Sequence, residues 1–385
     1  MHSRESLIWR IIGLVLALAQ VAVSALLVIS LIRINILESW IVAVAIGLLV
    51  ILFALCMVPV FIKRKKYYAM RIMCMVVSVV VIVGGIFAFR YTDSLNNLLD
   101  KVAVSESPGT VDTGIDITKE PFIAYISGSD SHTDVDDPYA RSDVNIIVVV
   151  NPAKGKILLA SIPRDTYVQL HGTTGYRDKL THAGLNNNVN LSKATLEDFL
   201  GIVIDYTIKV SFDTVVEVVD ALGGISINSD TYLPLSTWTK DGQFKYCTFV
   251  EGTQYVDGDC ALRFARERMS YRTGDKHRGE NQQEVLTGII NKFLSSNDYL
   301  LKLPEILDIA ADSFETTFMR DDITSFLRYQ LNNHTNWQIE SIGLDGVGDM
   351  LPTYTYGEDT PLWVMLPDEE SYQEVINKIY EYSEA

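Results

Sequence analysis

Basic side chains are concentrated in one stretch of an otherwise acidic sequence. Five arginines and one lysine lie between Arg263 and Arg278. A guanidinium group presents a rigid fork of N–H donors that matches two phosphate oxygens at once. Gln282 and Gln283 follow near the start of an expected helix, where neutral donors lie beside the positive end of the helix dipole. The stretch predicts a phosphate-binding cluster; the alternative is a helix face whose arginines pair with the surplus acids.

Two carboxylates upstream predict a metal site. Asp130 lies in the sequence Gly-Ser-Asp-Ser, and Asp143 ends the sequence Arg-Ser-Asp directly before an expected strand. Mg²⁺ takes oxygen ligands, and one or two carboxylates often hold it while substrate phosphates complete its coordination. Arg141, beside these acids, could bind a second phosphate oxygen. The alternative is that these residues are solvated turn residues, because Asp and Ser favour turns.

A third group follows the end of another expected strand. The sequence Ser-Ile-Pro-Arg-Asp places Arg164 just past that strand. Ligands of open α/β sheets bind beyond the ends of strands, so this arginine is well placed to reach a site. The alternative is an exposed arginine whose salt-bridge partner is Asp165. Asp178 and Lys179 lie downstream of this group.

The charge of the chain is unevenly distributed. Residues 1–90 contain nine Lys or Arg and two acids, whereas the rest contains 23 basic and 46 acidic residues, a net charge of −23. Nonspecific nucleic-acid binding needs a broad positive field. This composition argues against a nucleic-acid partner, and any anionic ligand must be held by a local basic cluster.

Three uncharged, apolar runs in the first 90 residues predict transmembrane helices, because each can cross a hydrocarbon core about 30 Å thick. Five positive charges lie in the second connection, between Lys63 and Arg71, and the positive-inside tendency puts that loop in the cytoplasm. The N-terminus is then cytoplasmic, and everything after Arg90 is extracytoplasmic. The alternative for the first run is a cleavable signal peptide ending near Ala25. The runs cover about residues 11–32, 40–62 and 72–89.

The cysteines fit this topology. Cys56 and Cys74 lie in the expected spans, whereas Cys247 and Cys260 are the pair in the outer domain. An oxidising exterior permits a disulfide between that pair, and the sequence leaves its formation open.

A polar stem and linker at residues 91–119 precede one expected α/β domain at residues 120–385. In this domain, β-branched runs of strand length alternate with segments whose apolar residues recur at helical spacing. Such alternation predicts a sheet covered by helices on both faces. Expected strands are 122–127, 144–150, 157–162, 206–210, 225–227, 337–342 and 362–365. Expected helices are 192–200, 213–222, 280–294, 300–310, 323–331 and 371–382, with Gly223 ending the second of them.

Taken in order, the motifs resemble those of the LytR-CpsA-Psr family. The resemblance covers nearly all of the chain from about 120 to 300. With it, the expected fold class is α/β: three N-terminal transmembrane helices followed by one extracytoplasmic αβα sandwich domain with a central mixed sheet. The matching motifs are Ile126-Ser-Gly-Ser-Asp-Ser131, Arg141-Ser-Asp143, Ser161-Ile-Pro-Arg-Asp165, Asp178-Lys-Leu-Thr-His-Ala183, Val219-Asp-Ala-Leu-Gly-Gly224 and Ala261 to Glu284.

The resemblance implies a metal-dependent phosphotransferase of the cell membrane. Such an enzyme moves a glycopolymer, with its linking phosphate, from a polyprenyl pyrophosphate carrier to a peptidoglycan hydroxyl. The polymer could be teichoic acid, capsule or another wall polysaccharide. The mechanism asks mainly for positioning and charge stabilisation, which a metal and several arginines supply.

The resemblance also assigns site residues position by position. Asp130 and Asp143 would bind Mg²⁺ or Mn²⁺. Lys179 and Asp165 would contact the ligand-binding side chains and hold them in position. Asp275 and Asp143 are both candidates for the general base, and the sequence does not separate them. The family's glutamine matches Gln282 or Gln283. The arginines expected to clamp the pyrophosphate are Arg141, Arg164, Arg266, Arg268 and Arg278.

Departures from the family pattern affect the acceptor preference more than the reaction. His132 stands where arginine is frequent, and residues 133–139 are unusually acidic. The glycine-rich turn expected after Ala183 is replaced by Gly184-Leu-Asn-Asn-Asn188. Other functional hypotheses are a glycan-binding protein without catalysis, a pyrophosphatase, and a membrane-bound transcriptional attenuator.

Overall fold

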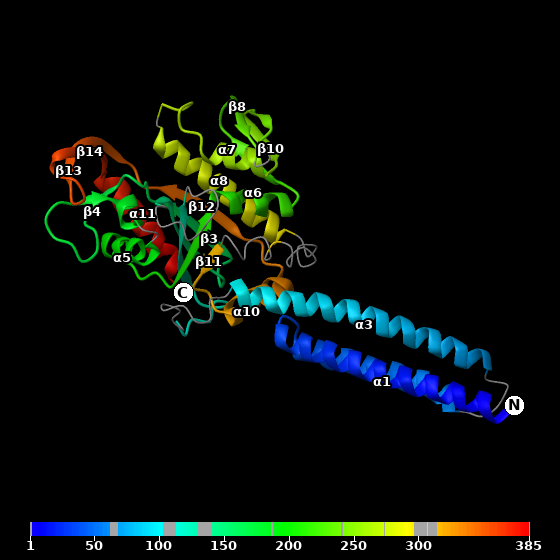
Figure 1. Ribbon diagram of the computed structural model, residues 1–385. Coiled ribbons are helices and arrows are strands. Elements are labelled where there is room, and N and C mark those ends of the chain that lie inside the picture. Colours follow the sequence, from blue (N-terminus) through cyan, green and yellow to red (C-terminus); the bar gives the residue numbers. More distant parts are fainter. Residues whose placement is uncertain are drawn as a thin grey trace. The chain divides into compact units, whose positions relative to one another are not determined.

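The computed structural model describes residues 2–61, 68–102, 113–129, 141–185, 188–239, 242–272, 274–295, 306 and 314–384 (Figure 1). The chain divides into two compact units, Met1–Leu99 and Asp100–Ala385. Among the predicted features, Asp130, His132, the acidic loop at 133–139 and most of the helix expected at 300–310 lie outside the described residues.

The N-terminal unit is built from three apolar helices. Segments Ile11–Ile34 and Ile72–Asn97 are long and apolar enough to cross a membrane, whereas the apolar segment of the second helix, Ser39–Leu55, is shorter. At 1.5 Å per residue that segment rises only about 25 Å, less than the hydrocarbon core. The described residues therefore give two candidate spans where three were predicted, with a third, shorter apolar helix. The helices are α1 (His2–Ile34), α2 (Ser39–Phe61) and α3 (Tyr68–Val102).

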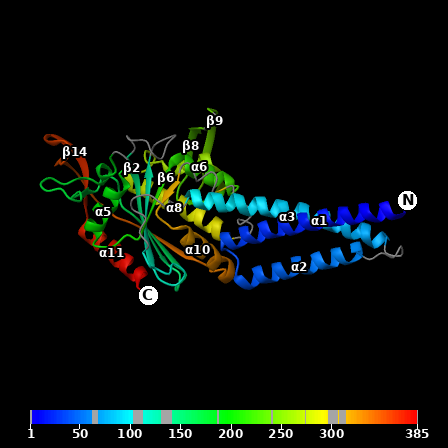
Figure 2. The ribbon, with the colours of Figure 1, turned by 60° about the horizontal axis from the view of Figure 1, so that its bottom comes forward.

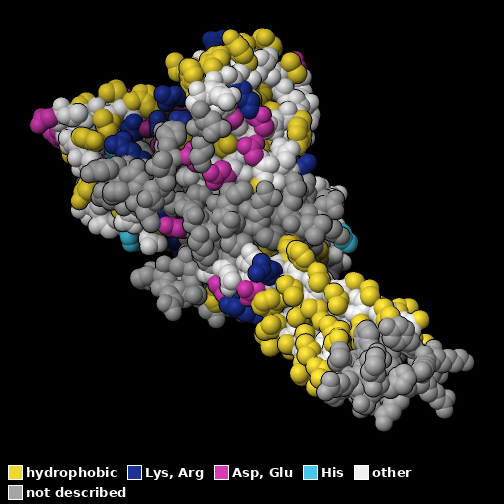
Figure 3. All heavy atoms as spheres, turned by 45° about the vertical axis from the view of Figure 1, so that its right-hand side comes forward, with side chains coloured by type: hydrophobic (Ala, Val, Ile, Leu, Met, Phe, Trp, Pro, Cys, Tyr) yellow, Lys and Arg dark blue, Asp and Glu magenta, His cyan; other side chains and the backbone are white. Residues whose placement is uncertain are grey.

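Hydrophobic side chains cover much of the described surface of these helices, as expected for a lipid-facing surface (Figure 3). The side chains of Leu18, Ile29 and Val80 are each more than 60% exposed. Polar contacts lie between helices instead: the amide of Asn96 in α3 donates hydrogen bonds to the carbonyl and hydroxyl oxygens of Ser30 in α1. In lipid the hydrophobic effect does not drive helices together, so such hydrogen bonds help to stabilise contacts between apolar helices.

The second unit contains a central six-stranded mixed sheet in the order β11-β6-β1-β2-β3-β12. β1 is parallel to β6 and antiparallel to β2, and β3 is antiparallel to β2 and parallel to β12. The turn between β2 and β3 is formed by residues 152–155. The predicted mixed sheet is confirmed. Its strands are β1 (Phe122–Ser129), β2 (Ser142–Asn151), β3 (Lys156–Ser161), β6 (Tyr206–Ser211), β11 (Phe314–Thr316) and β12 (Gln338–Gly343).

Helices cover both faces of this sheet, because alternate residues of its β-branched strands point to opposite sides (Figure 2). Ile147 and Val149 contribute to a core with α4 (Leu180–Ala183), α5 (Val189–Leu200) and α11 (Glu369–Ser383). Ile146 and Val148 contribute to a core with α8 (Asp275–Leu294) and α10 (Arg320–Asn333). The predicted helix-sheet-helix layering is therefore present.

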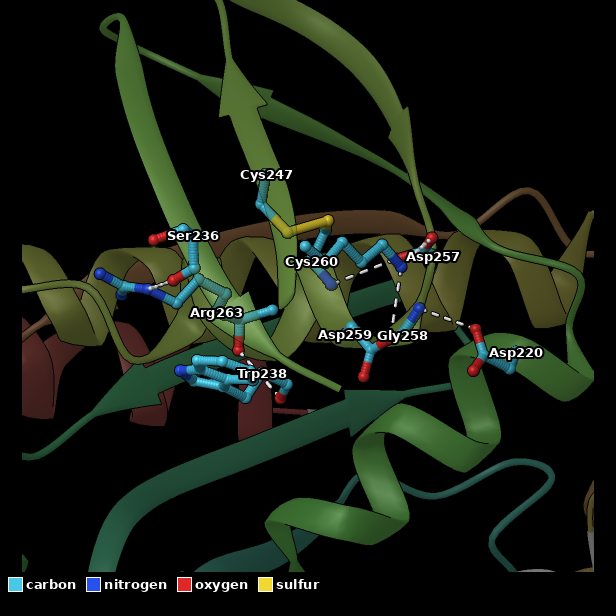
Figure 4. The surroundings of a disulfide bond; sticks show 11 residues. Asp220, Ser236, Trp238, Cys247, Asp257, Gly258, Asp259, Cys260 and Arg263 are labelled. Carbon is cyan, nitrogen blue, oxygen red and sulfur yellow. Dashed lines mark hydrogen bonds and ion pairs between the residues drawn. A yellow bond between two sulfur atoms is a disulfide. The ribbon is translucent and has the colours of Figure 1, made fainter. Parts of the chain in front are cut away.

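A smaller layer with its own core lies beside α8. Val219 of α6, Ile225 of β7, Phe249 of β9 and Phe264 of α7 are buried together in it. Cys247 and Cys260 form a disulfide that joins β9 to α7 (Figure 4). Its elements are α6 (Phe212–Ala221), β7 (Ile225–Ser229), β8 (Leu233–Trp238), β9 (Phe244–Phe249), β10 (Gly252–Val256) and α7 (Gly258–Ala265).

Gly223 ends α6 as predicted, because its φ of +74° is a conformation that favours glycine. The helices and strands missed by the sequence patterns are short or lie on exposed hairpins, where neither a helical nor a two-residue period is sustained. They comprise α4, α7, β8 to β11, and four further strands: β4 (Tyr167–Val168), β5 (Asp178–Lys179), β13 (Gly346–Thr353) and the N-terminal part of β14 (Gly357–Pro367).

Candidate functional site

The candidate residues meet at one edge of the central sheet. β1, β3, β6 and β12 end at this edge and β2 begins there, since Ser129 pairs with both Ser142 and Ser211, and Ser161 pairs with both Ile146 and Gly343. Asp143 is the second residue of β2, and Arg164 lies three residues past β3. The order of strands therefore brings together motifs that are far apart in the sequence.

Two adjoining cavities of about 220 and 190 Å³ lie at this edge. They share Asp143, Arg164, Arg278 and Gln282, so these four side chains form the wall between them. The larger cavity is also lined by Asn145, Ser161, Ile162, Pro163, Asp275, Lys276, Gly279, Glu280, Gln283, Gly343 and Leu344. The smaller is also lined by Phe212, Arg266 and Arg268.

The lining of the two cavities carries five basic and three acidic side chains. This is a local excess of positive charge in a part of the chain whose net charge is −23. Asp143 accepts a hydrogen bond from the Nη1 of Arg164 at 2.8 Å, and Asp165 lies 3.7 Å from the Nε of the same arginine. Burial alone would lower the pKa of Arg164, but the carboxylates of Asp143, Asp165 and Asp275 outweigh it and raise the pKa. Arg164 is therefore a fixed cation.

Arg278 is the more deeply buried of the two arginines in the shared wall, with 11% of its side chain exposed. Its pKa is lowered, first by burial and also by the positive charges of Arg164 and Arg268, although Asp275 and Asp143 act in the opposite direction. An arginine nevertheless remains protonated in this setting. Mutual repulsion between buried cations makes an anion between them favourable.

Both arginines have donors left over. The Nε atoms of Arg164 and Arg278 are buried and have no hydrogen-bond acceptor among the described residues. A buried donor without an acceptor costs free energy, and more so when it is charged. An anionic ligand in the adjoining cavities would remove this cost, so the two unpaired N–H groups point to a ligand with acceptor oxygens.

Arg266 and Arg268 are presented by the turn that follows α7. The buried carboxylate of Glu267 accepts a hydrogen bond from the backbone N–H of Ser270 at 2.8 Å and pairs with Arg263. Burial opposes ionisation of Glu267, but these two partners lower its pKa overall. Glu267 thus stabilises the turn through its contacts with Ser270 and Arg263. Arg266 and Arg268, its two neighbours in sequence, line the smaller cavity.

Asn145 is a cavity residue that the sequence reading missed. Its Oδ1 accepts hydrogen bonds from the hydroxyls of Tyr125, at 2.6 Å, and Ser142, at 2.7 Å. These donors fix the orientation of the amide, and its Nδ2 is buried without an acceptor in the described part of the chain. A single amide inside the β-branched run at 144–150 was the signal that could have identified it.

The two glutamines have different surroundings. Gln282 lines both cavities, whereas the amide of Gln283 donates hydrogen bonds to the carbonyl oxygens of Leu159 in β3 and Ile342 in β12. Gln283 touches the larger cavity, but its donors are used to join α8 to the sheet. Of the two glutamines left open by the sequence, the geometry therefore favours Gln282 for ligand contact.

The remaining predicted residues lie near the cavities or apart from them. Lys179 does not line either cavity; its ammonium group pairs with Asp165 at 2.8 Å, and Asp165 approaches Arg164 in turn. Asp165 does not line either cavity either, so both residues contact the cavity wall only through Arg164. Arg141 is exposed and does not line either cavity, so the structure does not bring it to the clamp. Asp275 lines the larger cavity and pairs with Arg278 at 2.8 Å.

Asp143 is the predicted metal ligand that the structure describes. Its side chain is 16% exposed, lines both cavities and lies beside cationic groups that would hold phosphates. One carboxylate with phosphate oxygens is an ordinary environment for Mg²⁺, so this donor fits such an ion. No cluster of three metal-binding side chains occurs among the residues that the structure describes.

Comparison with known proteins agrees with this geometry. The model of the LytR_cpsA_psr family matches residues 91–370. A curated protein of Bacillus anthracis, named polyisoprenyl-teichoic acid–peptidoglycan teichoic acid transferase TagU, is 30% identical over 251 residues, which cover 64% of this chain and 78% of the relative. A protein of the same name from Enterococcus faecalis is 35% identical over 205 residues, covering 53% of this chain and 64% of the relative.

A solved structure is similar as well. The crystal structure of B. subtilis TagV has 26% sequence identity and a TM-score of 0.55, and the match covers 69% of this chain and 98% of TagV. The region matched by the family model, residues 91–370, includes the arginine stretch, both cavities and the whole central sheet. Fold, motif order and sequence similarity agree, and the chain belongs to the LytR-CpsA-Psr family.

Proposed function

We propose that this protein transfers a wall glycopolymer, with its linking phosphate, from a polyprenyl pyrophosphate carrier to a hydroxyl of peptidoglycan. The observation that carries the proposal is that the buried Nε groups of Arg164 and Arg278, in one positively charged cavity wall, have no hydrogen-bond acceptor among the described residues. A diphosphate supplies the acceptor oxygens that these groups lack. The relatives named above are teichoic acid transferases, which supports a glycopolymer as the transferred group.

In the proposed step, the acceptor oxygen attacks the phosphorus that carries the glycan. A new P–O bond forms, the bond from that phosphorus to the bridging oxygen breaks, and polyprenyl monophosphate leaves. The hydroxyl proton passes to a base, for which Asp143 and Asp275 are the candidates in the cavities. The arginines hold both phosphates and stabilise the charge that develops during in-line attack.

A divalent cation would be held by Asp143, with Asp130 as the second proposed ligand, and would neutralise phosphate charge when bound. We expect chelation of divalent cations by EDTA to abolish transfer, and added Mg²⁺ or Mn²⁺ to restore it. Asp143→Asn should lower the transfer rate and raise the metal concentration needed for half-maximal rate. The assay compares the wild type and the variant over a metal titration. Full activity of wild type in EDTA would remove the metal from the proposal.

We further propose that the three N-terminal helices span the membrane and place the family domain outside the cell. Two apolar helices of sufficient length support membrane anchoring, and the full 23-residue length of α2 supports a third span. The basic segment at 63–71 supports a cytoplasmic second loop. The test is labelling of a Ser107→Cys variant with an impermeant maleimide on intact cells. We expect labelling from outside. Labelling only after lysis would show that the domain lies in the cytoplasm, which would favour the transcriptional attenuator.

The transferase proposal is tested with full-length protein in detergent, a radiolabelled polyprenyl-pyrophosphate glycan and purified peptidoglycan. We expect label to become covalently attached to peptidoglycan, with release of polyprenyl monophosphate in equal amount. Release of glycan phosphate without attachment would identify a pyrophosphatase. Binding of the lipid-linked glycan without turnover would identify a carrier-binding protein.

A further inference from the structure

An uncharged aromatic face lies on the hairpin formed by β8 and β9. Trp238, Phe244 and Tyr246 are 70%, 49% and 77% exposed. They alternate along the strands with buried residues such as Leu235 and Cys247, so they share the outer side of the hairpin. Monomeric proteins rarely leave large aromatic side chains grouped in water without a binding role. This hairpin face is outside both cavities described above.

The three rings form an ordered row. The ring centroids of Trp238 and Phe244 are 5.4 Å apart, and those of Phe244 and Tyr246 are 5.0 Å apart, both in edge-to-face arrangements. Strand pairing places Trp238 opposite Phe244 and Ser236 opposite Tyr246. Exposed Ser236 and Thr248 add hydroxyl groups on the same face. The face thus combines flat apolar surfaces with neutral hydrogen-bonding groups.

The chemistry of this face fits a sugar chain better than a membrane. A pyranose ring has an apolar C–H surface edged by hydroxyl groups, which matches flat rings interleaved with hydroxyls. Binding to an anionic membrane surface needs basic residues beside the aromatic groups. Lys245, the cation nearest in sequence among the described hairpin residues, is paired with Asp257 and Asp259. The net charge of −23 beyond residue 90 also opposes anionic lipid.

The hairpin is rigidly tied to the helix that leads into the arginine site. The disulfide joins Cys247 to Cys260 of α7, and the Nε of Arg263 donates a hydrogen bond to the carbonyl oxygen of Ser236 at 2.9 Å (Figure 4). α7 has eight residues, a length of about 12 Å, and Arg266 follows it directly. The hairpin that carries the aromatic face is therefore fixed to the helix that is followed directly by Arg266, a residue of the smaller cavity.

We infer that Trp238, Phe244 and Tyr246 form a docking face for the pyranose rings of the acceptor glycan. This inference rests on the proposed transfer to peptidoglycan and adds the surface that holds the acceptor. The aromatic face binds the glycan by stacking, and the arginine cavities bind the donor diphosphate. The two sites are separate, so the loss of one leaves binding at the other intact.

The experiment measures binding without a donor, so that it does not depend on catalysis. Full-length protein in detergent is sedimented with purified peptidoglycan stripped of attached polymers, and titrated with chitotetraose by saturation-transfer NMR. We expect Trp238→Ala and Tyr246→Ala to weaken binding roughly three- to tenfold, and Trp238→Phe to restore most of it. Tyr354→Ala removes a tyrosine of comparable exposure, 53%, away from the hairpin and should bind as wild type.

A transfer assay with the same variants supplies a second reading. The acceptor KM should rise for Trp238→Ala, while kcat at saturating acceptor and binding of the lipid-linked donor stay unchanged. The inference is overturned if both alanine variants bind glycan as the wild type does. It is also overturned if the variants lose binding to phosphatidylglycerol vesicles but keep their binding to glycan. An Arg164→Ala variant that binds peptidoglycan normally but transfers nothing supports both sites. If the wild type binds glycan normally but transfers nothing, the proposed transferase function is rejected and the docking face is retained.

Discussion

Replacing Arg278 with alanine is expected to reduce kcat for glycopolymer transfer by about 100- to 1000-fold, the effect of deleting one preorganised charged donor. Arg278 lies in the wall shared by both cavities, beside Arg164, and has a buried Nε without an acceptor among the described residues. Its donors cost free energy without a ligand and are satisfied when a diphosphate enters. Alanine leaves a cavity with one cation fewer at the point where negative charge develops.

A matched control comes from the same arginine-rich stretch. Arg272 is exposed and does not line either cavity, so Arg272→Ala should retain activity near that of the wild type. Arg278→Lys keeps the charge but loses the fork of donors, and should recover only part of the rate. Transfer is followed as label incorporated into peptidoglycan, with circular dichroism to verify folding. Equal loss in Arg278→Ala and Arg272→Ala would show that general charge, and not this cavity, governs the reaction.

The sequence identified several residues that line the cavities, but it did not show how they come together. Residue type was enough to single out Arg164, Arg266 and Arg268, because guanidinium groups are rarely concentrated in so acidic a domain. Their convergence depends on non-local pairing of β1 with β6 and of β3 with β12, which no local pattern encodes. The alternative for the stretch from Arg263 to Arg278, a helix face whose arginines pair with surplus acids, is partly met as well, because Glu267 pairs with Arg263 and Asp275 pairs with Arg278.

Other differences have local causes. Gln282 and Gln283 are adjacent in sequence but point about 100° apart around α8, and only the register of that helix against β3 decides which faces the cavity. The aromatic hairpin was missed because Trp238 and Phe244 occupy solvent-facing positions, where the two-residue period places polar residues in an ordinary strand. The disulfide, left open by the sequence, is formed because β9 and α7 pack together in the smaller core.

The second large effect is expected on stability, at the motif Asp178-Lys-Leu-Thr-His-Ala. Asp178 is fully buried and accepts hydrogen bonds from the backbone N–H groups of Lys179, at 2.7 Å, and Thr355, at 2.9 Å. Burial acts to raise the pKa of Asp178, but the hydrogen bond from His182 and those from Thr355 outweigh it, so the pKa is lowered overall. The carboxylate is ionised at neutral pH and can only accept, so the Nδ1 of His182, 2.6 Å away, is the donor.

Asp178→Ala should therefore lower the free energy of unfolding by on the order of 3 to 5 kcal/mol, because it leaves several buried donors without an acceptor. His171 and Asp198 form the matched control: they are 2.7 Å apart, close to the 2.6 Å between His182 and Asp178, but the side chains of His171 and Asp198 are 53% and 59% exposed. Asp198→Ala should cost less than about 1 kcal/mol. Urea unfolding of the full chain in detergent, followed by near-ultraviolet circular dichroism, measures both.

The stabilisation by Asp178 should also depend on pH. Since the folded pKa of Asp178 lies below its ordinary value of 3.8, its contribution to the free energy of unfolding is complete above that pH and is lost as the pH falls through the folded pKa. The difference between wild type and Asp178→Ala should accordingly shrink as the pH falls below 3.8; a difference that stayed unchanged in strong acid would contradict an ionised Asp178 in the folded protein.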